Sequence, residues 1–228
     1  MSSSQEETKI GVIVRTRNSV KLVKNAVNSV LNQTLPKELC ELVVVDDGSI
    51  DNTREVLRSY KDRIKVIEEK NLGHIRAANL GILHSGSEYV TLLDADDTFE
   101  PTILKEMLEV LENDKNIGFV YCDYYERNLE TGEMRVVSLK DNIFDSVAGG
   151  IIFRKSILIE FGLYDESLVF PEYDLLIKIM KKYKGIHIPK PLFTYNRHPC
   201  SLTANKMLVK KGLKQLFDKY GEIRIRKY

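Results

Sequence analysis

The sequence contains no tryptophan and only three cysteines, Cys40, Cys122 and Cys200. The cysteines are odd in number, far apart and without the short spacings of zinc ligands, so neither a disulfide framework nor a zinc site is expected. Long hydrophobic runs are missing as well: no stretch approaches the roughly 20 apolar residues of a membrane-spanning helix, and the start, MSSSQEETK, does not resemble a secretory signal. These absences predict a reduced protein that stays on the cytoplasmic side of the membrane.

An excess of charge of one sign is also absent over the whole chain, whose formal net charge is +1, but the charge is unevenly placed. Residues 205–228 contain eight Lys or Arg and two Asp or Glu, a net charge of +6. Four apolar residues recur in this segment, Leu208, Leu213, Leu216 and Phe217. We expect a basic helix that docks on the body through these side chains, with a peripheral contact to a membrane surface as the second interpretation. No nucleic-acid-binding motif accompanies the charge, so nucleic acid is not expected as a partner.

The first hundred residues alternate short apolar runs with amphipathic segments, in a chain of 228 residues that is long enough for one sizeable core. The apolar runs predict strands at 10–15, 41–45, 64–68 and 89–93. The segments between them predict helices at 20–32, 51–60 and 75–84. Three βαβ units in succession are typical of a parallel sheet with crossover helices.

After Pro101 the pattern changes to a mixture typical of α+β structure. Helices are predicted at 101–113, 155–161 and 171–183, and strands at 118–125, 185–188 and 192–196. The dipeptide Thr131-Gly132 suggests a β-turn between two strands.

Polar residues follow three of the predicted parallel strands: RTRN after the first, DDGS after the second and DADD after the fourth. Ligands of open parallel sheets bind beyond the carboxyl ends of the strands, where these segments would meet. Asp94 and Asp96 have no evident basic partner nearby in the sequence, and a hard divalent cation, Mg²⁺ or Mn²⁺, would relieve their repulsion. A metal-bridged phosphate compound is therefore one interpretation, and a turn-rich acidic loop is the other.

An ordered series of motifs resembles family 2 glycosyltransferases: VIVRTRN, SVLNQT, ELVVVDDGSIDNT, NLGHIRAANLGI, YVTLLDADD, FGLYDESLVFPEYDLLIKI and YNRHPCSLT. The resemblance runs over residues 9–203. It implies an α/β GT-A fold, with a Rossmann-like, mostly parallel sheet flanked by helices and an α+β acceptor-side half. It also implies a nucleotide-sugar donor, usually a UDP-sugar, Mn²⁺ or Mg²⁺, and inversion at the anomeric carbon by direct displacement. No QxxRW-like segment of processive synthases is present, which favours transfer of one sugar at a time.

The resemblance, together with the polar start and the basic end of the sequence, predicts how the chain is divided. Residues 1–8 are expected to be a disordered tail, and residues 9–204 a single domain. Within that domain, 9–98 would form the nucleotide-sugar-binding half and 99–204 the acceptor-side half. Residues 205–228 would be the basic helical tail. The expected partners are the donor and a carbohydrate or lipid-linked acceptor, while no oligomeric state is indicated.

Site residues are implied by position in the motifs. Thr16 would lie in the loop under the nucleotide, and Asp47 would accept a hydrogen bond from the base. Asp94 would face the ribose, Asp96 would be the direct metal ligand of the DxD motif, and His198 matches a histidine that approaches the metal or diphosphate in some members. The remaining predicted nucleotide-binding residues are Arg15, Asn18, Arg76 and Ala95.

Two positions depart from the family pattern. The catalytic base position falls on Glu172, with Pro171 where the preceding acid normally lies, and Asp174 is the competing candidate because a first-turn acid is also explained by the helix dipole. The family often has Ala-Arg-Asn where this chain has Ala77-Ala78-Asn79, so Arg76 either replaces that cation at the nucleotide or points to solvent.

Three other functions are compatible with parts of the pattern. These are a catalytically silent sugar-nucleotide-binding module, a phosphatase of the haloacid dehalogenase type, for which LLDADDT supplies a D-x-D-x-T motif, and a nucleotidyltransferase. The last lacks the expected glycine-rich loop after the first strand, and the phosphatase motif normally opens its fold rather than following three βαβ units.

Overall fold

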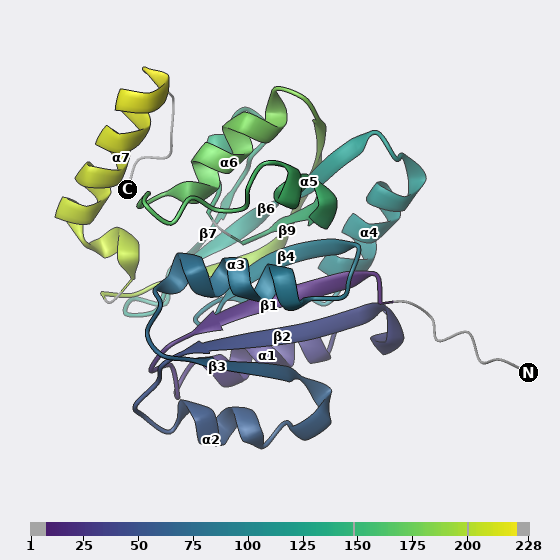
Figure 1. Ribbon diagram of the computed structural model, residues 1–228, viewed down its shortest axis with the longest axis vertical. Coiled ribbons are helices and arrows are strands. Elements are labelled where there is room, and N and C mark those ends of the chain that lie inside the picture. The colour runs from purple at the N-terminus through teal and green to yellow at the C-terminus, as the bar shows by residue number, and fades with distance from the viewer. Residues whose placement is uncertain (1–7, 148, 200, 223–228) are drawn as a thin grey trace, which may run out of the picture.

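Nine strands form one sheet in this structure, a computed structural model that describes residues 8–147, 149–199 and 201–222. Along the sheet the strands are ordered β3-β2-β1-β4-β8-β6-β9-β5, with β7 pairing β6. Figure 1 shows helices on both faces of this sheet. The tail predicted at residues 1–8 falls almost entirely outside the described residues.

The parallel half contains the βαβ units that the sequence predicts. Its strands are β1 (Ile10–Thr16), β2 (Cys40–Asp47), β3 (Lys65–Glu69) and β4 (Tyr89–Asp94). The helices between them are α1 (Val23–Leu31), α2 (Thr53–Arg58) and α3 (His74–His84). Two 3₁₀ helices, Lys37–Leu39 and Lys61–Arg63, precede β2 and β3.

The second half adds antiparallel and mixed pairing to the same sheet. Its strands are β5 (Thr98–Phe99), β6 (Ile117–Asn128), β7 (Met134–Val137), β8 (Ile151–Arg154) and β9 (Lys184–Arg197). Its helices are α4 (Ile103–Asn113), α5 (Lys155–Glu160), α6 (Pro171–Met180) and α7 (Lys206–Tyr220), with 3₁₀ helices at Ile143–Asp145 and Leu202–Ala204.

The alternation of strand side chains divides the core between the two faces of the sheet. Val12 and Val14 of β1 join a cluster that contains the apolar residues of α1 and α4. Ile13, between them, joins a second cluster with the apolar residues of α3, α5 and α6. Gly81 allows α3 to lie close to β1, because an added Cβ would meet Ile13 Cγ2 at 2.3 Å. This close packing fixes the N-terminal end of α3 beside the carboxyl end of β1.

Two features of the second half differ from the sequence prediction. The strands predicted at 185–188 and 192–196 are one strand, β9, and its pairing with β6 shifts register in the region of Pro189 and Pro191, which have no N–H to donate. Strand β8 was not predicted, and it lies antiparallel between β4 and β6. The hairpin predicted around Thr131-Gly132 is confirmed by the antiparallel pairing of β6 with β7. In the described part of the chain, none of the helices combines the length and apolar character that crossing a membrane requires.

Candidate active site

The carboxyl ends of β1, β2 and β4 lie side by side at one edge of the sheet, since Thr16 pairs with Asp46 and Arg15 pairs with Asp94. A cavity of about 860 Å³ opens there. Nine of the predicted site residues line it: Arg15, Thr16, Asn18, Asp47, Asp94, Ala95, Asp96, Glu172 and His198. Arg76 and Asp174 are not among its lining residues in the described chain.

Arg15 and Asp94 form an ion pair inside this cavity. Arg15 Nε lies 2.9 Å from Asp94 Oδ1, and a second guanidinium nitrogen donates to the same oxygen. The Arg15 side chain is only 11% exposed. Burial alone would lower the pKa of Arg15, but the Asp94 charge and hydrogen bond outweigh it and raise that pKa. The sequence showed no basic partner near Asp94, and the fold supplies one from 79 residues away.

Three carboxylates meet at the end of β4. Asp94, Asp96 and Asp97 each offer one oxygen, and these oxygens lie within 4.8 Å of one another. Asp97 is turned into the protein, since its Oδ1 accepts from the Asn196 backbone N–H at 2.8 Å. Burial, followed by the charges of Asp96 and Asp94, raises the pKa of Asp97 well above its usual value. Asp97 is thus held by a backbone N–H group. Asp96, by contrast, lines the cavity, and its carboxylate contacts His198.

Asp96 and His198 form the pair that could hold a metal. His198 Nε2 lies 2.8 Å from Asp96 Oδ2. Burial and the neighbouring Asp94 charge raise the pKa of Asp96, and the hydrogen bond from His198 opposes this rise. Carboxylate oxygen with imidazole nitrogen is a donor set that suits Mn²⁺ or Mg²⁺ when substrate phosphates complete the coordination. The residues present therefore fit such an ion.

The end of β9 carries His198 to the acidic loop. Asn196 Nδ2 donates to the Asp96 carbonyl oxygen at 2.7 Å, in addition to its backbone bond to Asp97. Ser201 Oγ accepts from the His198 backbone N–H at 3.2 Å. These bonds explain how residues about a hundred positions apart share one wall of the cavity.

Glu172 and Asp174, the two candidates for the catalytic base, have different environments in the first turn of α6. Glu172 lines the cavity and is half-buried, and burial raises its pKa to about 7, against the lowering effect of Arg15. Asp174 is 1% exposed and accepts from Lys178 at 2.6 Å and from Lys219 and Tyr220 at 2.5 Å each. Although burial alone raises the pKa of Asp174, these hydrogen bonds outweigh it and lower the pKa.

The loops that we expect to surround a nucleotide are hydrogen-bonded to one another. Asn18 has a positive φ of 50°, and its Oδ1 accepts from the Ile50 N–H at 2.8 Å. The Asp47 carboxylate accepts from the backbone N–H groups of Leu72 and Gly73, the latter at 3.0 Å. Asp47 is therefore already engaged by the protein backbone, and any bond to a base would use its remaining acceptor capacity.

Thr16 is a predicted site residue with a buried polar atom that the described residues leave unused. Its side chain is buried and lines the cavity, yet its Oγ1 has no hydrogen-bond partner within the described part of the chain. A buried hydroxyl without a partner is costly unless a ligand completes it. Arg76, by contrast, is exposed on α3 and is not among the described residues that line the cavity, which favours the interpretation that it points to solvent.

His74 was not predicted as a site residue, but it lines the cavity at the first position of α3. Burial and the Arg15 charge lower the pKa of His74, which favours the neutral imidazole. Tyr195 also lines the cavity, and burial raises its pKa to about 12. The sequence did offer a signal for His74, because NLGH follows the third predicted strand just as RTRN, DDGS and DADD follow the others.

The sequence profile of the family described as "Glycosyl transferase family 2" matches residues 11–162, which is most of the parallel half together with β6, β8 and α5. The chain belongs to this family. A relative, the minor teichoic acid biosynthesis protein GgaA of Bacillus subtilis strain 168, is 25% identical over an alignment of 230 positions that covers 91% of this chain and 52% of GgaA. The chain spans 36% to 58% of the length of the first three curated relatives that it matches.

Two solved structures share the GT-A fold of this family 2 chain. S. aureus TarS 1-349 in complex with UDP-GlcNAc has a TM-score of 0.71 and 22% identity, over 87% of this chain and 61% of TarS. The mannosyltransferase PcManGT from Pyrobaculum calidifontis, in complex with GDP-Man and Mn²⁺, has a TM-score of 0.76 and 20% identity, over 96% of this chain and 66% of PcManGT. At these identities the likeness establishes the α/β GT-A fold alone.

Proposed function

We propose that this chain is a metal-dependent, inverting glycosyltransferase that moves one sugar from a nucleotide-sugar donor to an acceptor hydroxyl. The observation that carries the proposal is the meeting of three groups around one cavity: the Asp96–His198 pair, the Arg15–Asp94 pair and Glu172. In this proposal the Asp96–His198 pair binds the metal and the diphosphate, the Arg15–Asp94 pair fixes the arrangement of charges, and Glu172 is the base. Membership of family 2 supports the same reaction class.

Glu172 is the base in this proposal. Its carboxylate would accept the proton of the acceptor hydroxyl as that hydroxyl attacks the anomeric carbon, and a pKa of about 7 leaves it partly ionised and well matched to proton transfer at neutral pH. A divalent ion held by Asp96 and His198 would offset the charge that develops on the diphosphate leaving group. Direct attack inverts the anomeric carbon and requires no second carboxylate as a nucleophile.

Arg15 and Thr16 bind and orient in this scheme. The Arg15 guanidinium neutralises Asp94 and keeps that carboxylate in one place, so the acidic cluster does not present all of its charges to the phosphates. Thr16 Oγ1 is buried and has no hydrogen-bond partner among the described residues, so it is available to an atom of the nucleotide-sugar donor. We propose a UDP-sugar as donor, supported by the UDP-GlcNAc bound in TarS, while the GDP-Man and Mn²⁺ in PcManGT make GDP-sugars the alternative.

The acceptor is proposed to be a carbohydrate or lipid-linked precursor of a cell-envelope glycan. The name of the relative GgaA, a minor teichoic acid biosynthesis protein, supports this class. The phosphatase and nucleotidyltransferase alternatives are set aside because the chain belongs to family 2. A catalytically silent sugar-nucleotide-binding module remains the competing function, and donor turnover distinguishes it from an enzyme.

The test is calorimetric titration of the protein with UDP and with GDP, each in Mn²⁺, Mg²⁺ or chelator, followed by an assay of donor hydrolysis. We expect metal-dependent binding of one nucleotide that is lost in Asp96→Ala. The control is Asp62→Ala, at an exposed acidic residue outside the cavity, and it should keep the binding. Hydrolysis should be lost in Glu172→Gln. Nucleotide binding without any Glu172-dependent turnover would favour the silent module, and no binding by the folded protein would refute the proposal.

A further inference from the structure

Helix α7 has one face that is fixed to the body of the protein. Gly212 and Leu216 are buried against the segment before α6. The approach is close, because a Cβ added at Gly212 would meet Phe170 Cδ2 at 2.5 Å and Val169 Cβ at 2.9 Å. Gln215 and Lys219 add polar contacts to the same segment and to α6.

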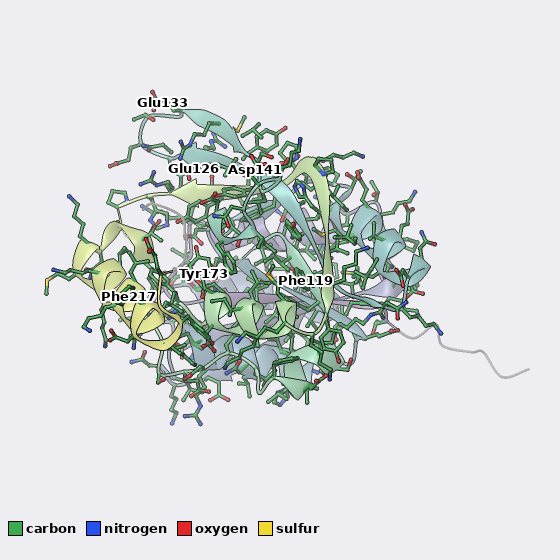
Figure 2. All side chains as sticks on the ribbon, turned by 90° about the horizontal axis from the view of Figure 1, so that it is seen from above. Phe119, Glu126, Glu133, Asp141, Tyr173 and Phe217 are labelled. Atoms are coloured by element: carbon green, nitrogen blue, oxygen red, sulfur yellow. The ribbon has the colours of Figure 1, made fainter. Side chains whose placement is uncertain are left out.

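The opposite face of α7 combines exposed apolar side chains with lysines. Met207 is 85% exposed, Phe217 is 61% exposed and Leu213 is 36% exposed. The expectation that Leu213 and Phe217 dock the helix on the body is therefore wrong, whereas Leu208 and Leu216 do pack there. Four exposed lysines lie on this face of the helix: Lys206, Lys210, Lys211 and Lys214. The one acid there, Asp218, is paired with Lys214 at 2.8 Å. Figure 2 shows Phe217 on α7 at the rim of the molecule, while Tyr173 lies inside. We name this outer face, formed by residues 206, 207, 210, 211, 213, 214 and 217, the α7 outer face.

We propose that the α7 outer face docks on an anionic membrane surface. A purely solvated helix face would carry the lysines without large apolar side chains between them, and exposed Met, Leu and Phe mark a contact surface. Lysines attracted to anionic headgroups, together with apolar side chains that enter the boundary with the acyl chains, form the pattern of interfacial helices. A second copy of this chain fits less well, because a symmetric contact would bring two sets of lysines together.

The inner face of α7, opposite to the docking surface, packs on one wall of the cavity. Phe170, against which Gly212 packs, lines the cavity two positions before Glu172. The 3₁₀ helix Leu202–Ala204 also contributes Leu202 and Thr203 to the lining and leads directly into α7. A membrane bound by the α7 outer face would therefore lie one helix away from the wall that contains Phe170 and the candidate base. This step rests on the proposed function, since it implies an acceptor that is anchored in the lipid.

The first test measures co-sedimentation of the 228-residue chain with vesicles of phosphatidylcholine alone or mixed with phosphatidylglycerol, without donor or metal. Binding should require phosphatidylglycerol, and the partition coefficient should fall at least about tenfold in Lys210→Glu/Lys214→Glu. Phe217→Ser/Met207→Ser should also weaken binding. The control Lys105→Glu/Lys115→Glu makes the same charge change on exposed residues in and just after α4, and should bind like the unchanged protein.

The absence of tryptophan permits a second readout that does not depend on loss of binding. Phe217→Trp should show a blue-shifted emission when phosphatidylglycerol vesicles are added, whereas Leu83→Trp, a site 54% exposed on α3, should not. No binding to anionic vesicles, or equal weakening by the α4 control, would overturn the proposal. So would a concentration-dependent dimer that is lost in Phe217→Ser without vesicle binding.

The vesicle assays need no nucleotide, so their result separates this inference from the proposed function. Vesicle binding through α7 with no nucleotide binding would leave the docking surface in place and remove the enzyme. Nucleotide binding and turnover without vesicle binding would do the reverse. Binding of a nucleic acid by the α7 outer face in place of vesicles would also count against the lipid surface.

Discussion

His198 Nε2 lies 2.8 Å from the Asp96 carboxylate, although 102 residues separate the two in the sequence. The contact is made by the end of β9, where Asn196 bonds to the Asp97 carboxylate and to the Asp96 carbonyl oxygen. Neither residue is a complete metal site alone. Their meeting turns an acidic loop into a mixed carboxylate and imidazole donor set, the kind that accepts a divalent ion together with phosphates.

The first prediction concerns His198 as a metal ligand. His198→Ala should lower Mn²⁺ affinity in the presence of the nucleotide by at least about tenfold, because one coordinating nitrogen is lost. Free Mn²⁺ can be followed by its electron paramagnetic resonance signal. His84→Ala, at an exposed histidine near the end of α3, is the matched control and should leave the affinity unchanged. If His198 only steadies the loop, its removal would lower the melting temperature while Mn²⁺ affinity stays the same.

The pH dependence of turnover should report Glu172. Because burial raises the pKa of Glu172 to about 7, kcat/KM is expected to fall about tenfold per pH unit below that value and to level off above it. Glu172→Gln should lower kcat by roughly 10²- to 10⁴-fold and remove this limb of the profile. Nucleotide affinity measured by calorimetry should change little. A residual activity in Glu172→Gln that keeps the same pH limb would assign the base elsewhere.

The free energy of unfolding should also depend on pH through Glu172, but it should fall as the pH rises, whereas kcat/KM rises. The folded-state pKa of Glu172 is above its unfolded value of about 4.5, so its favourable contribution is present below pH 4.5 and is lost as the pH rises through 7. Glu172→Gln should therefore match the unchanged protein near pH 4 and be more stable at pH 8, by about 1 to 2 kcal/mol after allowance for solvent screening. Urea unfolding at the two pH values provides the measurement. A variant that is less stable at pH 8 would show that the carboxylate is stabilised by contacts rather than strained by burial.

Asp174 should behave as a structural residue. Asp174→Asn removes the charged partner of Lys178 and leaves Lys219 with only the more distant Asp165, at 3.9 Å, so the free energy of unfolding should fall by about 2 to 4 kcal/mol. Tyr220→Phe removes one hydrogen bond of the same group and should cost about 1 kcal/mol. At a temperature where both variants are folded, kcat should stay within about tenfold of the unchanged protein, since Asp174 does not line the cavity. If Asp174→Asn lost as much kcat as Glu172→Gln while its cooperative thermal unfolding showed a folded protein, Asp174 would be assigned as the base instead of Glu172.

Local patterns predicted the parallel half of this fold well, because its strands and helices follow regular hydrophobic periods. Strand β8 escaped prediction because its partners, β4 and β6, are distant in sequence and its four residues carry no turn signal of their own. The candidate site was predicted only in part for the same reason, since some of its contacts join residues that are distant in the sequence. Motif positions placed Asp96, His198 and Glu172 at the cavity, but the ion pair of Arg15 with Asp94 depends on the parallel register of β1 with β4. The exposure of Arg76 depends on how α3 is rotated against the sheet, which one sequence does not specify.

Arg15 should control the pKa of the base as well as the position of Asp94. Its charge lowers the pKa of Glu172, whereas the Asp94 charge raises it. Arg15→Met leaves Asp94 without its partner, so the pH limb of kcat/KM should move above 7, and nucleotide affinity should fall because a further negative charge then faces the phosphates. Arg15→Lys should restore the position of the limb in part, since it returns the charge but not the paired hydrogen bonds of the guanidinium. Arg58→Met, at an exposed arginine on α2 outside the cavity, is the control and should leave the profile unchanged. If Arg15→Met lowered kcat without moving the limb, Arg15 would act on the donor directly, and its effect on Glu172 would be too small to matter for the reaction.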